Sequence, residues 1–339
     1  MQTLTVYCEG GLANRIKVLL SGKLVSELTG RHYTMYWPLN KACAARYDDL
    51  FANKLHVISA SVLDCPKFPQ VNGWLESMPD PLESDIDHLM INHVDWLINP
   101  NKFKKHEPHW VRCLELLDEL DPIPVLQSRI QRFIDDLFLP NMIGVHIRRG
   151  DFLHARPEVA GNTEEVMQEL DAAIEQISGA GVLLCTDDGA VIHGNTDVQP
   201  EGIIPKFQKR YGAKIIIPEI RSLDRNSPDA IQDALVSLML LRKTDRIIGT
   251  EGSTFSHLAQ LGRDVSFKSI SGGVPSYRRL IFKMKLSGIY YLIKVASRAQ
   301  FGRYMPFHIA MNHYFKLPKK LVSKLRSGIK KLFRIFIIR

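Results

Sequence analysis

The sequence lacks the features that define several common classes of protein. Its five cysteines are scattered and never spaced Cys-x-x-Cys, which argues against a disulfide framework and against a zinc site. No uncharged apolar run reaches the roughly 18–20 residues that a membrane-spanning helix needs. The first residues, MQTLTVYCEGG, have neither the basic nor the apolar region of a secretory signal. We therefore expect a reduced, cytoplasmic protein.

Two familiar phosphate-binding motifs are also missing. The chain contains neither G-x-x-x-x-G-K-[ST] nor G-x-G-x-x-G, which argues against P-loop chemistry and against simple NAD chemistry. Asp85 and Asp87 have the D-x-D spacing with which some enzymes hold Mn²⁺ or Mg²⁺, but they belong to an acidic loop, LESDIDH. We expect no metal site and no cofactor.

Acidic residues are absent after Asp264, and this divides the chain by charge. The segment that follows carries 17 Lys and Arg residues, so only 27 of the 44 basic residues oppose the 36 acidic ones in the first 264. A nucleic-acid-binding body would be basic, and this body is acidic. Within residues 318–339, apolar residues recur at helical spacing among lysines and arginines, which predicts a basic amphipathic helix on an anionic membrane surface.

The rest of the chain alternates between strand-like and helix-like runs, which predicts βα units and parallel sheets. A proline-containing break at 121–125 separates two such sets and predicts an interdomain connection. We expect strands near 4–10, 33–37, 54–59, 88–92, 142–147, 181–185, 213–218 and 245–249, and helices near 14–30, 109–120, 126–138, 163–177, 228–244 and 256–262.

Four of the expected strands end in unusual polar residues. Because ligands of open parallel sheets bind beyond the carboxyl ends of the strands, four such ends suggest a shared ligand cleft. An arginine at a strand tip suits a diphosphate, since its planar fork donates two parallel charge-assisted hydrogen bonds. Small residues at a helix start can bring backbone N–H groups to phosphate oxygens. The four ends are Glu9–Arg15, His146–Asp151, Thr186–Asp188 and Thr250–Thr254.

These motifs together resemble those of the superfamily of α1,2-, α1,6- and protein O-fucosyltransferases. GVHIRRGD is similar to its His-x-Arg-Arg-x-Asp signature, LLCTDD to its second motif and DRIIGTEGSTFSHLA to its third. GGLANRI is similar to a Gly-Gly-Leu-x-Asn stretch of bacterial members. The resemblance covers roughly residues 4–37 and 142–262.

The resemblance implies a GT-B type α/β fold of two facing Rossmann-like domains with a basic helical tail. We expect an acceptor-side domain at 1–125, a nucleotide-sugar-binding domain at 126–275 and the tail at 276–339. It also implies an inverting, metal-independent transfer of L-fucose from GDP-β-L-fucose. The acceptor would be a glycan or glycolipid of a bacterial surface, such as lipopolysaccharide O-antigen or its lipid-linked precursor, reached from the inner face of the plasma membrane.

The resemblance also assigns candidate residues. Arg148 would bind the β-phosphate and stabilise the departing nucleotide, while Glu251, Asp151 and Glu9 are alternatives for the acceptor base. The predicted donor site comprises His146, Arg148, Arg149, Asp187, Asp188, Asp233, Ser253, Thr254 and Ser256, with Gly10, Gly11, Asn14 and Arg15 from the first domain.

One position departs from the pattern. Relatives often carry an aspartate beside the guanine eight residues before the one that matches Asp245, and this chain has Ser237 there, with Asp233 one turn earlier. Three hypotheses therefore stay open: a fucosyltransferase, a GT-B enzyme for another nucleotide sugar, and a non-enzymatic membrane-docked scaffold whose arginines form structural ion pairs.

Overall fold

The computed structural model describes residues 2–61, 80–100, 104–150, 163–188, 190–192, 195–197 and 202–270. The predicted basic tail, the candidate Asp151 and the junction at 275 and 276 lie outside these residues. Within the described ranges, no helix combines the length and the apolarity needed to cross a lipid bilayer.

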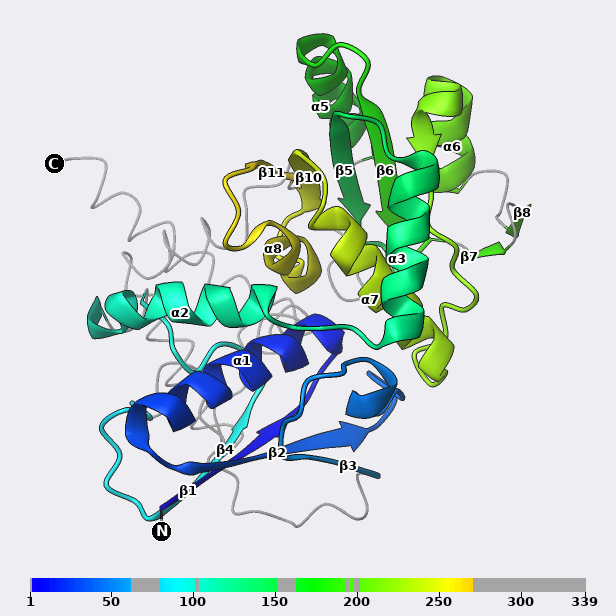
Figure 1. Cartoon of the computed structure of the whole chain (residues 1–339). Helices are drawn as coiled ribbons and strands as arrows, with labels where there is room; N and C mark the ends of the chain where they lie inside the picture. Colours follow the sequence, from blue (N-terminus) through cyan, green and yellow to red (C-terminus); the bar gives the residue numbers. More distant parts are fainter. Residues whose placement is uncertain are drawn as a thin grey trace, which may run out of the picture. The chain divides into compact units, whose positions relative to one another are not determined.

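The first part of the chain builds a four-stranded parallel sheet with the strand order β3-β2-β1-β4. Leu4, Val6 and Cys8 are buried at alternate positions of β1, as expected for a strand with one covered face. Figure 1 shows α1 lying along this sheet. The elements are β1 (Thr3–Cys8), α1 (Leu12–Thr29), β2 (His32–Leu39), β3 (Val57–Ser61) and β4 (His88–His93).

In the described part of the chain, two 3₁₀ helices and two α-helices lie between β2 and the first strand of the second sheet. The 3₁₀ helix η1 lies between β2 and β3, η2 and α2 follow β4, and α3 begins at Pro124, inside the predicted break at 121–125. Proline suits this first turn, because its missing N–H would have no helical partner there. Their bounds are η1 (Tyr47–Asp49), η2 (Lys104–His106), α2 (Glu107–Asp118) and α3 (Pro124–Leu137).

The second sheet has five parallel strands in the order β11-β10-β5-β6-β9. The strands β5 and β6 lie inside it, and all of their residues are buried. Its strands are β5 (Met142–Ile147), β6 (Gly181–Thr186), β9 (Ile215–Ile216), β10 (Arg246–Thr250) and β11 (Ser266–Ile270). Its other elements are α5 (Thr163–Gln176), the hairpin β7 (Ala190–Ile192) and β8 (Asn195–Asp197), α6 (Ile203–Tyr211), η3 (Gly212–Lys214), α7 (Pro228–Leu241) and α8 (Thr254–Gln260).

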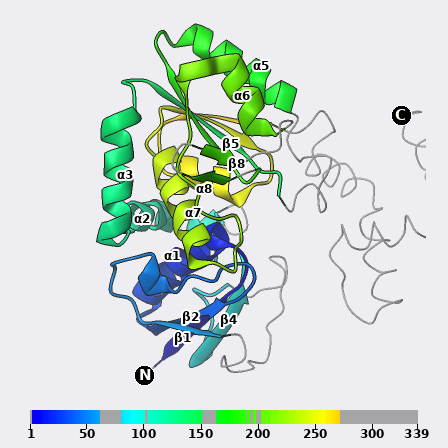
Figure 2. The same ribbon diagram turned by 90° about the vertical axis from the view of Figure 1, so that its right-hand side faces the viewer.

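Strand alternation decides which helices cover each face of the second sheet. Ile143, Val145 and Ile147 join an apolar cluster with residues of α5 and α6. Met142 belongs to the other cluster, which contains residues of α7 and α8. Figures 1 and 2 show α5 and α6 together at one end, away from α7 and α8. Residues of β5 in register with Met142, including His146, therefore face α7 and α8.

The expected fold class is confirmed, because both sheets are parallel and carry helices. The cluster around Met142 also contains residues of the first sheet and of α1, α2 and α3, so one apolar core connects the two sheets. All of the described residues belong to one compact unit. The division between residues 125 and 126 stays a prediction.

One expected strand has the wrong bounds, and two elements were not expected. The strand expected at 213–218 shrinks to Ile215–Ile216, because residues 212–214 form the 3₁₀ helix η3 and Pro218 has no N–H for a ladder. The sequence pattern also predicts neither α6 nor β11. Pro205 in the apolar stretch of α6 indicates a break, but it lies in the first turn, where a helix tolerates proline.

Candidate functional site

The polar ends of three neighbouring strands lie at one edge of the second sheet. Since β10, β5 and β6 are adjacent and parallel, their carboxyl ends meet at that edge. The backbone N–H of Arg148 donates to Oγ1 of Thr250 at 2.9 Å, and this hydroxyl lies 3.3 Å from the carbonyl oxygen of His146. Thr250 thus joins the turns after β5 and β10. Thr250 was expected only as part of a polar strand end, although its place as the last residue of a buried strand was a usable signal for this role.

Arg148 forms an ion pair with the first residue after β6. Its Nη1 lies 2.8 Å from Oδ2 of Asp187, and about a fifth of each side chain is exposed, at 21% and 20%. The other oxygen of Asp187 accepts the backbone N–H groups of Arg149 at 2.6 Å and Gly150 at 3.0 Å. The guanidinium is therefore held at the carboxyl edge of the sheet by a carboxylate that is not sealed from solvent.

Arg149 and Asp188 form a second pair beside the first. Nη1 of Arg149 lies 3.3 Å from Oδ2 of Asp188, and the same oxygen accepts the backbone N–H of Ile203, the first residue of α6, at 2.9 Å. The Asp188 carboxylate thus satisfies an N–H group that has no partner inside the helix. The turn after β5 thus contributes two arginines and the turn after β6 two aspartates, so their formal charges balance.

His146 is buried between β5 and α8 and bonded there. Its Nδ1 lies 2.7 Å from Oγ of Ser256, and its ring stacks on Phe255 with centroids 4.7 Å apart. Burial and, to a lesser extent, the nearby positive charge of Arg148 together lower the pKa of His146 to about 3. The imidazole is therefore neutral at physiological pH and is held in place by Ser256 and Phe255. Phe255 was not among the expected residues, although it lies inside the EGSTFS stretch.

The close approach of α8 to β10 requires a glycine. A Cβ at Gly249 would lie 2.6 Å from Cβ of Ser256, which is closer than side chains tolerate. Ser253 caps α8 by position without a side-chain hydrogen bond and is buried, while Thr254 is half-buried. Glu251 is also half-buried, and its backbone N–H donates to the carbonyl oxygen of Ile270 at 2.8 Å. The structure therefore brings Glu251, Ser253, Thr254 and Ser256 to the same edge as Arg148.

The other four candidates follow the first strand, β1. Gly10 and Gly11 form the turn before α1, and Asn14 and Arg15 lie in the first turn of that helix. Gly10 has φ +86°, a left-handed conformation that favours glycine, and a Cβ on it would lie 3.0 Å from Nδ2 of Asn14. Gly11 precedes α1, and nothing lies within 4 Å of a Cβ built on it. Oδ1 of Asn14 is buried and accepts no hydrogen bond from the residues described. The turn is therefore narrow, glycine-dependent and contains one unsatisfied acceptor.

Arg15 supports this turn from inside the protein. Its side chain is completely buried, its guanidinium lies over the Trp37 ring at 5.2 Å, and it donates to the carbonyl oxygens of Gly10 and Pro38 and to Oδ1 of Asn40. Without exposed surface, Arg15 cannot line a ligand cleft in this conformation, contrary to expectation. It instead joins the ends of β1 and β2, because a buried guanidinium needs several acceptors.

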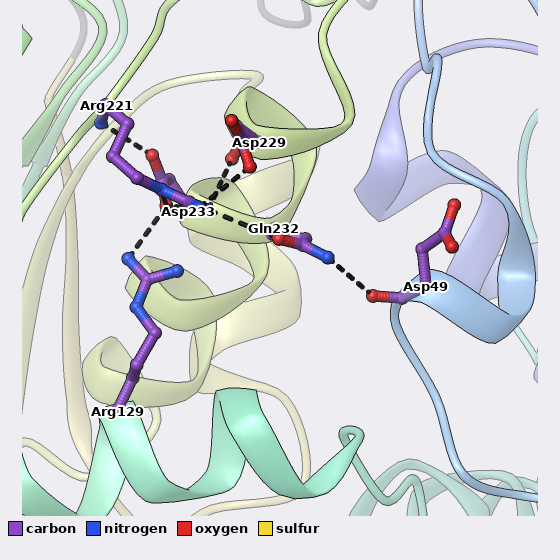
Figure 3. A network of polar contacts seen from close by, with 6 residues as sticks. All are labelled: Asp49, Arg129, Arg221, Asp229, Gln232 and Asp233. Carbon is purple, nitrogen blue, oxygen red and sulfur yellow. Dashed lines mark hydrogen bonds and ion pairs between the residues drawn. The ribbon is translucent and has the colours of Figure 1, made fainter.

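Asp233 belongs to a different network, on α7 (Figure 3). Its side chain is 1% exposed, and Oδ1 accepts from Arg129 at 2.8 Å and from both Nε and Nη2 of Arg221. Its Oδ2 accepts the backbone N–H of Arg221 at 2.6 Å. All of these bonds stay within the protein, so the carboxylate is not available to a nucleotide base, contrary to expectation. Ser237, one turn later, is buried and offers no carboxylate.

Comparisons with known proteins connect this architecture to one group of structures. No protein-family model matches the chain, and no curated protein matches it by sequence. The structure is similar to a crystal structure of NodZ α-1,6-fucosyltransferase soaked with GDP-fucose, at 15% sequence identity and a TM-score of 0.52 over 77% of this chain and 92% of that one.

Two further structures of NodZ give the same result. One is fucosyltransferase NodZ from Bradyrhizobium, with 15% identity and a TM-score of 0.51 over 77% of this chain and 93% of that one. The other was co-crystallised with GDP and has 14% identity and a TM-score of 0.52 over 77% of this chain and 92% of that one. The chain thus has the fold of these fucosyltransferases across nearly their whole length.

Proposed function

We propose that this protein is a glycosyltransferase that takes its sugar from a nucleoside diphosphate sugar. The observation that carries the proposal is the Arg148 guanidinium at the carboxyl end of β5, beside the turns after β6 and β10. In a parallel sheet this edge is where ligands bind, and a guanidinium there suits a diphosphate. The fold likeness to NodZ, solved with GDP-fucose, makes GDP-β-L-fucose the first candidate donor.

The reaction would be a single inverting displacement at the anomeric carbon of the donor. An acceptor hydroxyl forms the new glycosidic bond and gives up its proton, while the bond to the diphosphate breaks and its electrons go to the leaving nucleotide. Arg148 would stabilise this growing negative charge, which a fixed cation does without reorganisation. Two described residues are candidates for the base that accepts this proton. Glu251 follows β10 at the same edge as Arg148, and Glu9 is an exposed residue that follows β1 of the first sheet.

A nucleotide sugar whose nucleobase is not guanine is the second candidate donor, and a specific observation favours it. Asp233 is fully engaged by Arg129 and Arg221, and Ser237 has no carboxylate. Guanine exposes two adjacent N–H donors that a carboxylate would accept, and α7 does not present one from either position. The fold and Arg148 would serve another nucleoside diphosphate equally well.

Calorimetric titration of the full chain with GDP, UDP and CMP tests the proposal. We expect one diphosphate to bind, with GDP supporting the fucosyl donor and UDP supporting the second candidate. Transfer from the matching nucleotide sugar to a glycan acceptor would then establish the activity. Absence of binding by all three nucleotides would contradict the proposal and favour the scaffold hypothesis.

We also propose that the acceptor is lipopolysaccharide or a lipid-linked precursor at an anionic membrane. The basic segment 276–339 would bind the protein to that membrane. The 17 basic residues after Asp264, with no acidic ones among them, support this part of the proposal. We expect the full chain to sediment with vesicles that contain anionic lipid, and a chain that ends at 315 to sediment less. Equal sedimentation of the two chains would contradict a membrane role for residues 316–339.

A further inference from the structure

The contacts of the Asp187 carboxylate resemble those that proteins make with a bound anion. Two successive backbone N–H groups, those of Arg149 and Gly150, converge on its Oδ1 at 2.6 and 3.0 Å. The guanidinium of Arg148 approaches the other oxygen at 2.8 Å. Converging backbone N–H groups with an arginine beside them are how proteins hold phosphate and similar anions. The turn after β5 is therefore an anion seat, and the side chain of Asp187 fills it.

The carboxylate fills this seat incompletely. Although Nη1 of Arg148 lies 2.8 Å away, Oδ2 of Asp187 is buried and accepts no hydrogen bond from the residues described. An ion pair whose buried oxygen accepts no well-aligned hydrogen bond is weaker than a charge-assisted hydrogen bond. The same oxygen lies 2.5 Å from the position of a Cβ on residue 150, so the seat also depends on Gly150. About a fifth of the Asp187 side chain is exposed, so the carboxylate can move from the seat into solvent.

The neighbouring aspartate, Asp188, has a different set of contacts from Asp187. Oδ2 of Asp188 accepts the first N–H of α6 and lies beside Arg149, and the backbone N–H of Asp188 donates to Oγ1 of Thr186 at 3.2 Å. Asp188 thus secures the start of a helix, whereas all the described contacts of Asp187 are with the turn that carries Arg148. The two aspartates have the same charge and nearly the same exposure but different roles.

We propose that Asp187 is a displaceable counter-anion that occupies the seat of the terminal phosphate and leaves it when a nucleoside diphosphate binds. The inference rests on the proposed function for the identity of the ligand. Two anions cannot share the two N–H groups and the same edge of Arg148, so the diphosphate and Asp187 compete. Competition reduces the association constant of the diphosphate to its intrinsic value multiplied by the fraction of molecules in which the seat is empty. Asp187 would therefore favour release of the nucleotide after sugar transfer.

Because Asp187 competes with the ligand, we expect its removal to strengthen ligand binding, whereas removal of a ligand-binding residue would weaken it. In Asp187→Asn and Asp187→Ala, we expect GDP and inorganic pyrophosphate to bind about tenfold more tightly, because the competing charge is gone. GMP has no β-phosphate to place in the seat, so its affinity should stay the same. Asp188→Asn, the matched control, should not tighten the binding of any of the three ligands.

Calorimetry on the folded full-length variants, with folding checked by circular dichroism, distinguishes the outcomes. Weaker or unchanged pyrophosphate binding in both Asp187 variants would overturn the inference and make Asp187 a fixed support for Arg148, even if the wild type binds GDP. Tighter pyrophosphate binding in a protein that binds no nucleotide would support the anion seat and refute the proposed function. An equal gain for GMP and GDP would also overturn the assignment to the terminal phosphate.

Discussion

Replacing Arg148 by alanine is expected to reduce the rate of sugar transfer about 10²- to 10³-fold, the usual effect of removing one preorganised group that stabilises developing charge. The reduction should appear mainly in kcat, because negative charge on the leaving nucleotide is greatest in the transition state. Steady-state kinetics with the donor identified by calorimetry would measure it. Arg148→Lys should recover only part of the rate, since an ammonium lacks the planar fork.

Arg132→Ala is the matched control for this experiment. Arg132 is an exposed arginine on α3, so the variant removes the same charge without touching the strand ends. We expect its kinetic constants to equal those of the wild type. Normal turnover by Arg148→Ala would show that the site lies elsewhere on the molecule.

Replacing Asp233 by alanine should destabilise the fold by about 3 kcal/mol, near the lower end of the cost of breaking a buried ion pair. The variant leaves Arg129 and Arg221 beside an empty site, and their side chains are 23% and 34% exposed, so water can compensate them in part. Urea unfolding would measure the loss. The network is also connected to the first sheet's part of the chain, because Gln232 donates to the backbone carbonyl of Asp49 at 3.0 Å (Figure 3).

Asp229→Asn is the control for the buried network. Asp229 pairs with Nη1 of Arg221 at 2.7 Å, but its side chain is 56% exposed, so its loss should cost no more than about 1 kcal/mol. The same two variants test the assignment of Asp233. If Asp233→Ala kept its stability and selectively lost nucleotide affinity, Asp233 would be a ligand contact and not a structural one.

Local pattern was enough to predict most of the second sheet. The apolar run MIGVHI and the run GVLLC are strands at 142–147 and 181–186, because continuous burial requires continuous apolar residues. The helix α1 ends at Thr29, with Gly30 at φ +67°, as its sequence indicates. Short elements such as α6 and β9 were missed or misplaced, because few residues define them and their neighbours in space are distant in sequence.

The candidate site was predictable only as a set of strand ends. Arg148, Asp187 and Glu251 were expected at one edge because parallel strands end together, and the structure places them there. Their partners were not predictable. The pairing of Arg148 with Asp187 and of His146 with Ser256 depends on which strands and helices become neighbours. Arg15 and Asp233 carry charges that looked available to a ligand, and burial among protein partners makes both structural.

The sequence by itself determined that this protein has two parallel βα sheets and places arginines at the tip of a core strand, because burial periodicity and turn residues act over a few neighbouring positions. Only the tertiary structure decided which charges are already paired. That choice follows from the strand order, which places the turn after β6 against the turn after β5 and so puts Asp187 in the anion seat of Arg148.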